Sequence, residues 1–272
     1  IDFLRRSVVE HKFNLVCLGI VNGMRLKSHP EIAGPNAYSK EDVCRIVRFL
    51  NDHGVDVVPV VEALGHAEWL TVPHPDWAEP GEPRTLCPNN PAVRKALLEI
   101  FEEVGEVFGA RQIHFGLDEV TWPAAHGRSK PCPFCGDRPL KQIFADQVNW
   151  LHDWAAQRHL RMMMWADMLI PEQNGGPPWN VGQSLDLIPR DIVLCDWSLG
   201  MSSSSLADLR RAGFAVDLGF SGNVGRRMKR ANKVNARAAV ILGADELARH
   251  EQRPGRGRPA MPGGISRQAS TP

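Results

Sequence analysis

The chain has 272 residues, 43% of them hydrophobic, and its 32 Lys and Arg nearly balance its 31 Asp and Glu. This length and apolar content suit one large α/β domain or two smaller ones with an ample core. No apolar run approaches the roughly 18 residues that span a bilayer, which excludes a membrane-spanning protein. No signal peptide is visible, so we favour the cytoplasm, although the chain opens at Ile1 without an initiator Met and the compartment stays open.

The charge is unevenly distributed along the chain. Residues 201–272 hold 13 Lys and Arg against 5 Asp and Glu, a balance of +8, and residues 1–200 hold 19 against 26, a balance of −7. This asymmetry predicts two segments of different origin or function.

Apolar periodicity predicts alternating helices and strands over most of the chain. In chain order we expect helix 2–11, strand 14–21, helix 39–54, strand 55–61, helix 91–107, strand 112–117, helix 140–158, strand 161–165 and strand 192–197. Ser39 fits an N-cap, with Asp42 in the N3 position. The Pro-rich stretches 72–91 and 171–180 are predicted as loops.

This alternation, with mostly buried strands, predicts a parallel sheet, and its repetition predicts an α/β fold of the (β/α)8 TIM-barrel type. In such barrels, catalytic side chains gather at the carboxyl ends of the strands. Five successive predicted strands end in polar or aromatic residues, namely Asn22 and Arg25, Glu62 and His66, Asp118 and Glu119, Trp165 and Asp167, and Asp196 and Trp197. The sequence therefore predicts a functional site at this end of the barrel.

Asp118 and Glu119 are the most informative pair in the chain. They follow a short apolar run and would lie where the strand 112–117 gives way to a loop. Consecutive strand side chains point to opposite faces, so the two carboxyl groups would have different surroundings and different pKa values. The alternative from the pair alone is a loop that carries two surface acids.

Four motifs resemble those of the family 20 glycoside hydrolases, chiefly β-N-acetylhexosaminidases. They are residues 60–67 (Val-Val-Glu-Ala-Leu-Gly-His-Ala), 86–91 (Leu-Cys-Pro-Asn-Asn-Pro), 114–119 (His-Phe-Gly-Leu-Asp-Glu) and 165–168 (Trp-Ala-Asp-Met). They occur in the family's order and cover about residues 1–198. We expect a barrel domain over 1–200.

The resemblance implies retaining, substrate-assisted hydrolysis of a terminal β-linked N-acetylhexosamine. In this mechanism the 2-acetamido oxygen of the sugar replaces the enzyme nucleophile. By resemblance, Glu119 is the general acid and base, and Asp118 holds the acetamido N–H and stabilises the oxazolinium-like intermediate. The resemblance also implies a glycan substrate and no metal or organic cofactor. The oligomeric state stays open.

Three further residues are expected to bind substrate near the acidic pair. His66 would orient the sugar or a catalytic carboxylate, and Glu62 stands where the family usually has Asp. His114 would form hydrogen bonds behind the pair, with a satisfied core histidine as the alternative.

Aromatic and acidic residues at the later strand ends complete the predicted site. Trp165 and Trp197 would form apolar walls for the sugar, with core packing as the alternative. Trp122 would line an outer subsite or close over the barrel. Asp167 and Asp196 would bind sugar hydroxyls, or form salt bridges at the strand ends.

The chain also departs from the family pattern. Leu117 replaces the second glycine of the catalytic motif, and Leu64 replaces a usual proline. The first barrel strand, which supplies a sugar-binding arginine in the family, is expected to be absent, so the barrel is predicted to be incomplete. The only tyrosine is Tyr38, and no tryptophan follows Trp197, so the late-barrel tyrosine and tryptophan are missing too.

Cys132 and Cys135 have the spacing of a metal-binding pair, and His126 is close in sequence. A structural zinc site usually needs a second pair of ligands. We therefore expect a loop disulfide or two free thiols here rather than zinc.

The C-terminal segment has a different resemblance. Residues 209–217, 225–233 and 236–243 are similar to the anticodon-binding domain of histidyl-tRNA synthetases, which suggests a basic α/β segment over 201–251 and a disordered tail over 252–272. Either foreign sequence follows a truncated glycosidase, or residues 214–218 and 238–242 serve as the last barrel strands. This segment suggests RNA (tRNA) binding through 206–251 as an alternative function. A separate alternative is a catalytically inactive barrel that binds sugar.

Overall fold

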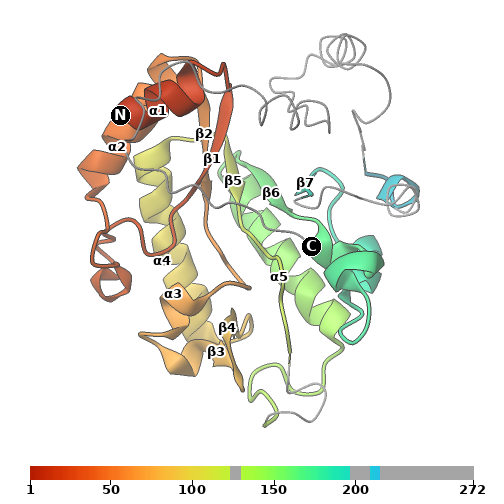
Figure 1. Cartoon of the computed structure of the whole chain (residues 1–272). Coiled ribbons are helices and arrows are strands. Elements are labelled where there is room, and N and C mark those ends of the chain that lie inside the picture. The colour runs from red at the N-terminus through yellow and green to blue at the C-terminus, as the bar shows by residue number, and fades with distance from the viewer. Residues whose placement is uncertain (123–129, 197–208, 215–272) are drawn as a thin grey trace, which may run out of the picture. The chain divides into compact units, whose positions relative to one another are not determined.

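A computed structural model describes residues 1–122, 130–196 and 209–214 (Figure 1). The chain divides into two compact units, Ile1–Asp217 and Leu218–Pro272, and every described residue belongs to the first. The predicted basic segment beyond Phe214, the tail and the predicted domain boundaries near 200 and 251 lie outside the described residues. No helix in the described part has both the length and the apolar character to cross a membrane.

Five parallel strands form the main sheet, and they lie side by side in chain order, as the sequence predicts (Figure 1). They are β1 (Leu15–Gly19), β2 (Asp56–Val60), β5 (Gln112–His114), β6 (Arg161–Trp165) and β7 (Val193–Cys195). The register pairs Leu15 with Asp56 and Gln112 with Arg161. Strands in chain order with helices between them are the arrangement of part of a (β/α) barrel.

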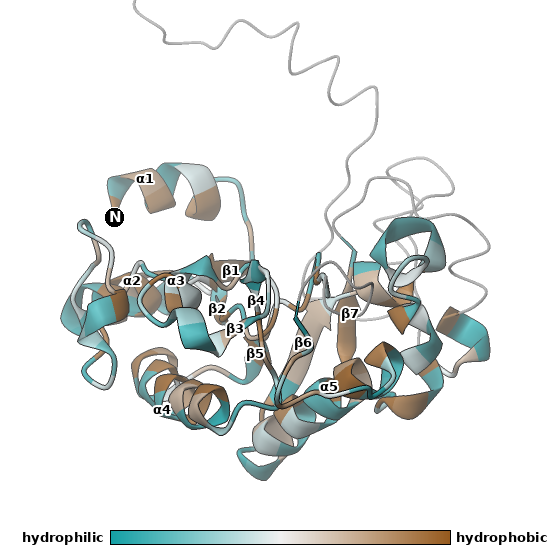
Figure 2. Cartoon of the chain, turned by 90° about the horizontal axis from the view of Figure 1, so that it is seen from below, coloured by the Kyte–Doolittle hydropathy of each residue, from teal (hydrophilic) through white to brown (hydrophobic). Residues whose placement is uncertain are grey.

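The helices α2 (Lys40–Asp52), α4 (Pro91–Phe108) and α5 (Leu140–Gln157) lie around the outside of the strands (Figure 2). The Ser39 hydroxyl caps α2 by accepting the Asp42 N–H at 3.1 Å, as predicted. Asn90 caps α4 in the same way, and Pro91 takes the first helical position. The N-terminal helix consists of α1 (Asp2–Leu4) and the π-helical turn η1 (Arg5–Val9).

One continuous core joins the sheet to the helices. Fully buried members include Leu50 of α2, Ile100 and Phe101 of α4, and Phe144 of α5. The rings of Phe101 and Phe115 lie 4.9 Å apart, which ties α4 to the end of β5.

The predicted loop 72–91 is wrong in part, because it contains an antiparallel hairpin. The hairpin consists of β3 (Ala78–Glu79) and β4 (Glu82–Leu86), and Gly81 at φ +81° supplies its turn. The short helices α3 (Glu68–Thr71) and η3 (Pro75–Trp77) precede it. Strands this short contain no readable alternation, so periodicity could not reveal them.

Short helical turns also replace part of the second predicted loop. They are η5 (Asp167–Leu169), η6 (Pro171–Gly175) and η7 (Val181–Leu187). β5 is shorter than predicted because Gly116 and Leu117 have φ of +67° and +74°, which ends the extended backbone.

Candidate active site

Backbone hydrogen bonds between neighbouring strands continue beyond the carboxyl ends of the strands. They bring several of the predicted site residues together. The Val61 N–H donates to His114 O at 2.8 Å, and the Trp165 N–H donates to Gly116 O at 3.0 Å. The carboxyl groups of Glu62, Asp118 and Asp167 therefore lie near one another, just beyond the ends of β2, β5 and β6.

Glu62 and Asp118 form a half-buried acid pair. Burial, followed by the charge of Asp118 and a hydrogen bond with it, raises the pKa of Glu62 to about 8. Burial also raises the pKa of Asp118, which the charge of His66 opposes. Of the two carboxyl groups, Glu62 is therefore the one that more readily keeps a proton, and it forms a hydrogen bond with Asp118.

Glu119 occupies a different environment one residue later. Its side chain is 43% exposed, whereas that of Asp118 is 15% exposed. Its backbone has φ +48°, and its N–H donates to Asp167 Oδ2 at 3.0 Å. The left-handed conformation turns Glu119 out of the strand direction, so the two carboxyl groups have different surroundings, as the sequence predicts.

His66 lies between the two carboxylates. Its Nε2 is 3.4 Å from Asp118 Oδ2 and 3.4 Å from Glu119 Oε2. Gly65 lies against the Asp118 backbone, where a Cβ would be 2.1 Å from Asp118 O. A single imidazole can therefore interact with both acids.

His114 is the last residue of β5. It is 1% exposed, and its Nδ1 accepts the Gly116 N–H at 3.0 Å, which leaves the proton on Nε2. Burial lowers the pKa of His114 to about 4, so the ring is neutral at pH 7. Its ring centroid lies 4.6 Å from that of half-buried Trp165.

Asp167 is fully buried beneath Glu119. Besides the Glu119 N–H, its Oδ2 accepts the side-chain amide of Asn174 at 2.9 Å. This arrangement favours holding the Glu119 backbone over the predicted contact with a sugar hydroxyl.

The structure gives the remaining predicted residues other contacts. Trp122 is 2% exposed and packs edge to face against Trp179, at 6.4 Å between ring centroids. Asp196 is half-buried and accepts the side-chain amide of Gln173 at 3.3 Å. Trp197 lies outside the described residues.

Two residues of the site were not predicted from the sequence. Arg84 of the hairpin strand β4 places its guanidinium 3.7 Å from Glu119 Oε2, and Asn174 of η6 contacts Asp167. Both lie on segments that were predicted as loops. Only a correct prediction of the hairpin could have brought Arg84 to the site.

Gly116 is expected to tolerate no side chain. A Cβ there would lie 1.7 Å from Glu62 Oε2, in addition to the cost of φ +67°. We expect Gly116→Ala to lower the free energy of unfolding by about 3 kcal/mol or more. The measurement is denaturant unfolding.

The matched control for this substitution is Gly54→Ala. Gly54 has φ +74° but nothing within 4 Å of the added Cβ, so it pays only the backbone cost of about 1–2 kcal/mol. Equal losses for the two variants would contradict the close packing of Glu62 on Gly116.

The Glu62 carboxyl is expected to make stability depend on pH. Its pKa is about 8 in the folded chain against an ordinary 4.5, so the unfolded chain ionises first as the pH rises. Wild type should therefore lose stability relative to Glu62→Gln between about pH 4.5 and pH 8, by about 4 kcal/mol. The Gln amide keeps the donor towards Asp118 without a charge.

Unfolding curves of both proteins across this pH range test the expectation. Glu41→Gln, an exposed change on α2, is the control substitution. If the difference in free energy of unfolding between wild type and Glu62→Gln does not change across this pH range, Glu62 is already ionised in the folded chain.

Fold and site together define a class of protein: a (β/α)-barrel type fold with paired carboxylates at the carboxyl ends of its strands. The model of "Glycosyl hydrolase family 20, catalytic domain" matches residues 18–216. The chain belongs to this family.

Individual relatives agree with this assignment. A beta-hexosaminidase of Akkermansia muciniphila is 24% identical over 201 residues, which cover 68% of this chain and 37% of the relative. The crystal structure of a beta-N-acetylhexosaminidase from Bacteroides fragilis aligns with a TM-score of 0.60 and 19% identity, covering 80% of this chain and 46% of that one. This likeness shows the fold. The chain thus spans less than half the length of either protein.

Another relative is a different kind of protein and matches only a short segment of this chain. A histidine–tRNA ligase of Rhodospirillum rubrum is 65% identical over 40 residues, which are 15% of this chain and 10% of the ligase. This agrees with the resemblance found in the C-terminal segment. RNA binding through 206–251 stays a prediction, because nearly all of that segment lies outside the described residues.

Proposed function

We propose that the chain hydrolyses terminal β-linked N-acetylhexosamine, GlcNAc or GalNAc, from glycans by a retaining, substrate-assisted mechanism. The observation that carries the proposal is the pair Asp118 and Glu119 at the end of β5, in which Glu119 is the more exposed, with His66 Nε2 3.4 Å from both carboxylates. Membership of glycosyl hydrolase family 20 supports the same reaction.

Glu119 is assigned the acid and base role. In its protonated form it donates to the glycosidic oxygen while the acetamido oxygen of the sugar attacks the anomeric carbon and the glycosidic bond breaks. The carboxylate of Glu119 then takes a proton from water, which opens the oxazolinium ring with overall retention. Its exposure gives it access to both the leaving group and water.

Asp118 is assigned to the acetamido group. As an anion it accepts the acetamido N–H and stabilises the positive charge that develops on the ring. Its low exposure strengthens this interaction, because the local dielectric constant is lower than that of water. Glu62 supports this role: while it holds the proton, the negative charge stays on Asp118.

The other site residues support these two. Asp167 fixes the Glu119 backbone, and His66 and Arg84 stabilise the carboxylate that Glu119 becomes after donating its proton. Trp165, half-buried beside His114, offers an apolar face to the sugar.

The test is release of 4-nitrophenol from its β-N-acetylglucosaminide, with the β-glucoside as the control substrate. Substrate assistance predicts turnover of the first and little of the second, because the glucoside has no acetamido oxygen. Equal turnover of both would overturn the mechanism. A cooperatively folded chain that binds N-acetylglucosamine without turnover would favour the inactive sugar-binding barrel.

A further inference from the structure

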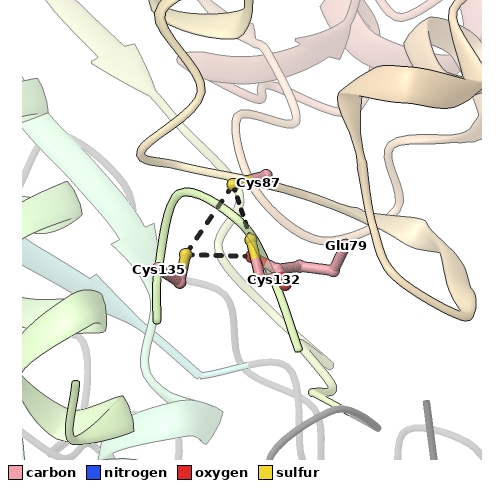
Figure 3. Close-up of side chains that lie close together, drawn as sticks. All are labelled: Glu79, Cys87, Cys132 and Cys135. Carbon is pink, nitrogen blue, oxygen red and sulfur yellow. Dashed lines mark hydrogen bonds between the residues drawn. The ribbon is translucent and has the colours of Figure 1, made fainter. Parts of the chain in front are cut away.

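Four buried side chains outside the candidate active site lie close together (Figure 3). Glu79 comes from β3, Cys87 directly follows β4, and Cys132 and Cys135 come from the loop before α5. Each is at most 5% exposed. Their ligand atoms all lie within 4.8 Å of one another.

The distances in this cluster fit a shared metal ion rather than a disulfide. Cys87 Sγ lies 3.3 Å from Cys132 Sγ and 3.7 Å from Cys135 Sγ, and Cys135 Sγ lies 3.2 Å from Glu79 Oε1. A disulfide needs about 2.05 Å between its sulfur atoms. Thiolates around tetrahedral Zn²⁺, at about 2.3 Å each, lie about 3.7 Å apart.

The loop from Cys132 to Gly136 is folded for such a site. The Gly136 N–H donates to Cys132 O at 3.0 Å, and Gly136 has φ +57°, which closes a tight turn. The main-chain amides of Phe134 and Cys135 donate to Cys132 Sγ. Donors aimed at sulfur stabilise a metal-bound thiolate.

A side-chain amide from another segment also donates a hydrogen bond to one of these sulfur atoms. The Asn89 side-chain amide donates to Cys135 Sγ at 3.4 Å. Among the described residues, no Lys or Arg forms an ion pair with Glu79, although it is 2% exposed. Buried carboxylates are normally paired with a cation or coordinate a metal.

We propose that Cys87, Cys132, Cys135 and Glu79 bind one Zn²⁺ in a closed, structural site. Three thiolates and one carboxylate are a ligand set for this borderline-soft ion, and four protein ligands leave no open position for catalysis. The ion joins the β3–β4 hairpin to the loop that follows β5.

This site connects to the active site through the hairpin. Arg84, which lies 3.7 Å from Glu119, is on β4, three residues before Cys87. The ion would thus hold in place the strand that carries Arg84. The sequence hides the ligand set, because Cys87 precedes Cys132 by 45 residues and the fourth ligand is a glutamate.

The first test is the metal content of the full chain, purified without chelator from zinc-supplemented medium. We expect about one zinc per chain for wild type and for Cys17→Ser, whose thiol is exposed and outside the cluster. Cys135→Ser should lose the metal, and Glu79→Gln should release it at a lower chelator concentration. Chelation should also lower the Tm of wild type.

A second measurement covers the case in which the cysteine variants fail to fold. Wild type loaded with Co²⁺ should show a sulfur-to-cobalt charge-transfer band and the intense visible bands of a tetrahedral site. Thiol reagents should reach Cys87, Cys132 and Cys135 in the native chain only after chelation.

Three results would overturn the proposal. The first is wild type that neither retains nor takes up stoichiometric zinc. The second is a cobalt spectrum without the sulfur band. The third is an unreduced chain two hydrogens lighter than its sequence, with a peptide map that places the disulfide between two of Cys87, Cys132 and Cys135.

Discussion

Glu119→Gln is expected to lower kcat/KM for 4-nitrophenyl β-N-acetylglucosaminide by about 10²–10⁴-fold. Glutamine keeps the size of the side chain and its place beside His66 and Arg84. It cannot supply the proton that the leaving oxygen needs. Steady-state kinetics of the variant and wild type measure the loss.

A better leaving group makes this prediction specific. A dinitrophenyl glycoside needs less protonation, so Glu119→Gln should recover much of its rate on that substrate. Glu41→Gln, on the exposed face of α2, should match wild type on both substrates. A variant at position 119 with wild-type kinetics would remove Glu119 from the acid role.

Asp118→Asn is expected to cause a loss of about 10²–10³-fold, mainly in kcat. The change keeps the shape of the side chain but removes the negative charge that faces the developing oxazolinium ion. It also replaces an acceptor by an amide that can present a donor to the acetamido N–H. The same glycosides provide the assay.

For this variant the loss should persist with the dinitrophenyl leaving group, because Asp118 acts on the sugar and not on the leaving oxygen. Asp52→Asn, exposed at the end of α2, serves as the control. Unchanged turnover by Asp118→Asn would show that the acetamido group needs no anion in this chain.

The regular part of the fold could be predicted from the sequence because its signals are local. The β-branched run that became β2 and the Ser39 cap of α2 depend on neighbouring residues alone. The hairpin β3–β4 could not be predicted, because its strands have two and five residues and Pro83 interrupts the pattern.

The candidate site, like the fold, could be predicted only in part from the sequence. Asp118 and Glu119 are adjacent in sequence, and the rule for strand ends brings Glu62 and His66 near them. The backbone conformations are not readable, because Leu117 at φ +74° and Glu119 at φ +48° are held by tertiary contacts. Leu117 takes the place of a glycine in the family motif, and its positive φ shows why glycine suits that position.

Contacts between distant segments account for the rest. Arg84, Asn174 and the Glu79–Cys87 half of the proposed metal site reach their partners only after the chain has folded. No spacing rule connects Cys87 to Cys135.

The most direct test compares nitrophenyl and dinitrophenyl N-acetylglucosaminides on wild type, Glu119→Gln and Asp118→Asn in one experiment. Our assignment predicts that the better leaving group restores much of the rate of Glu119→Gln and little of that of Asp118→Asn. If the two variants respond alike, or if neither differs from wild type, then Glu119 and Asp118 do not have the separate roles proposed for them.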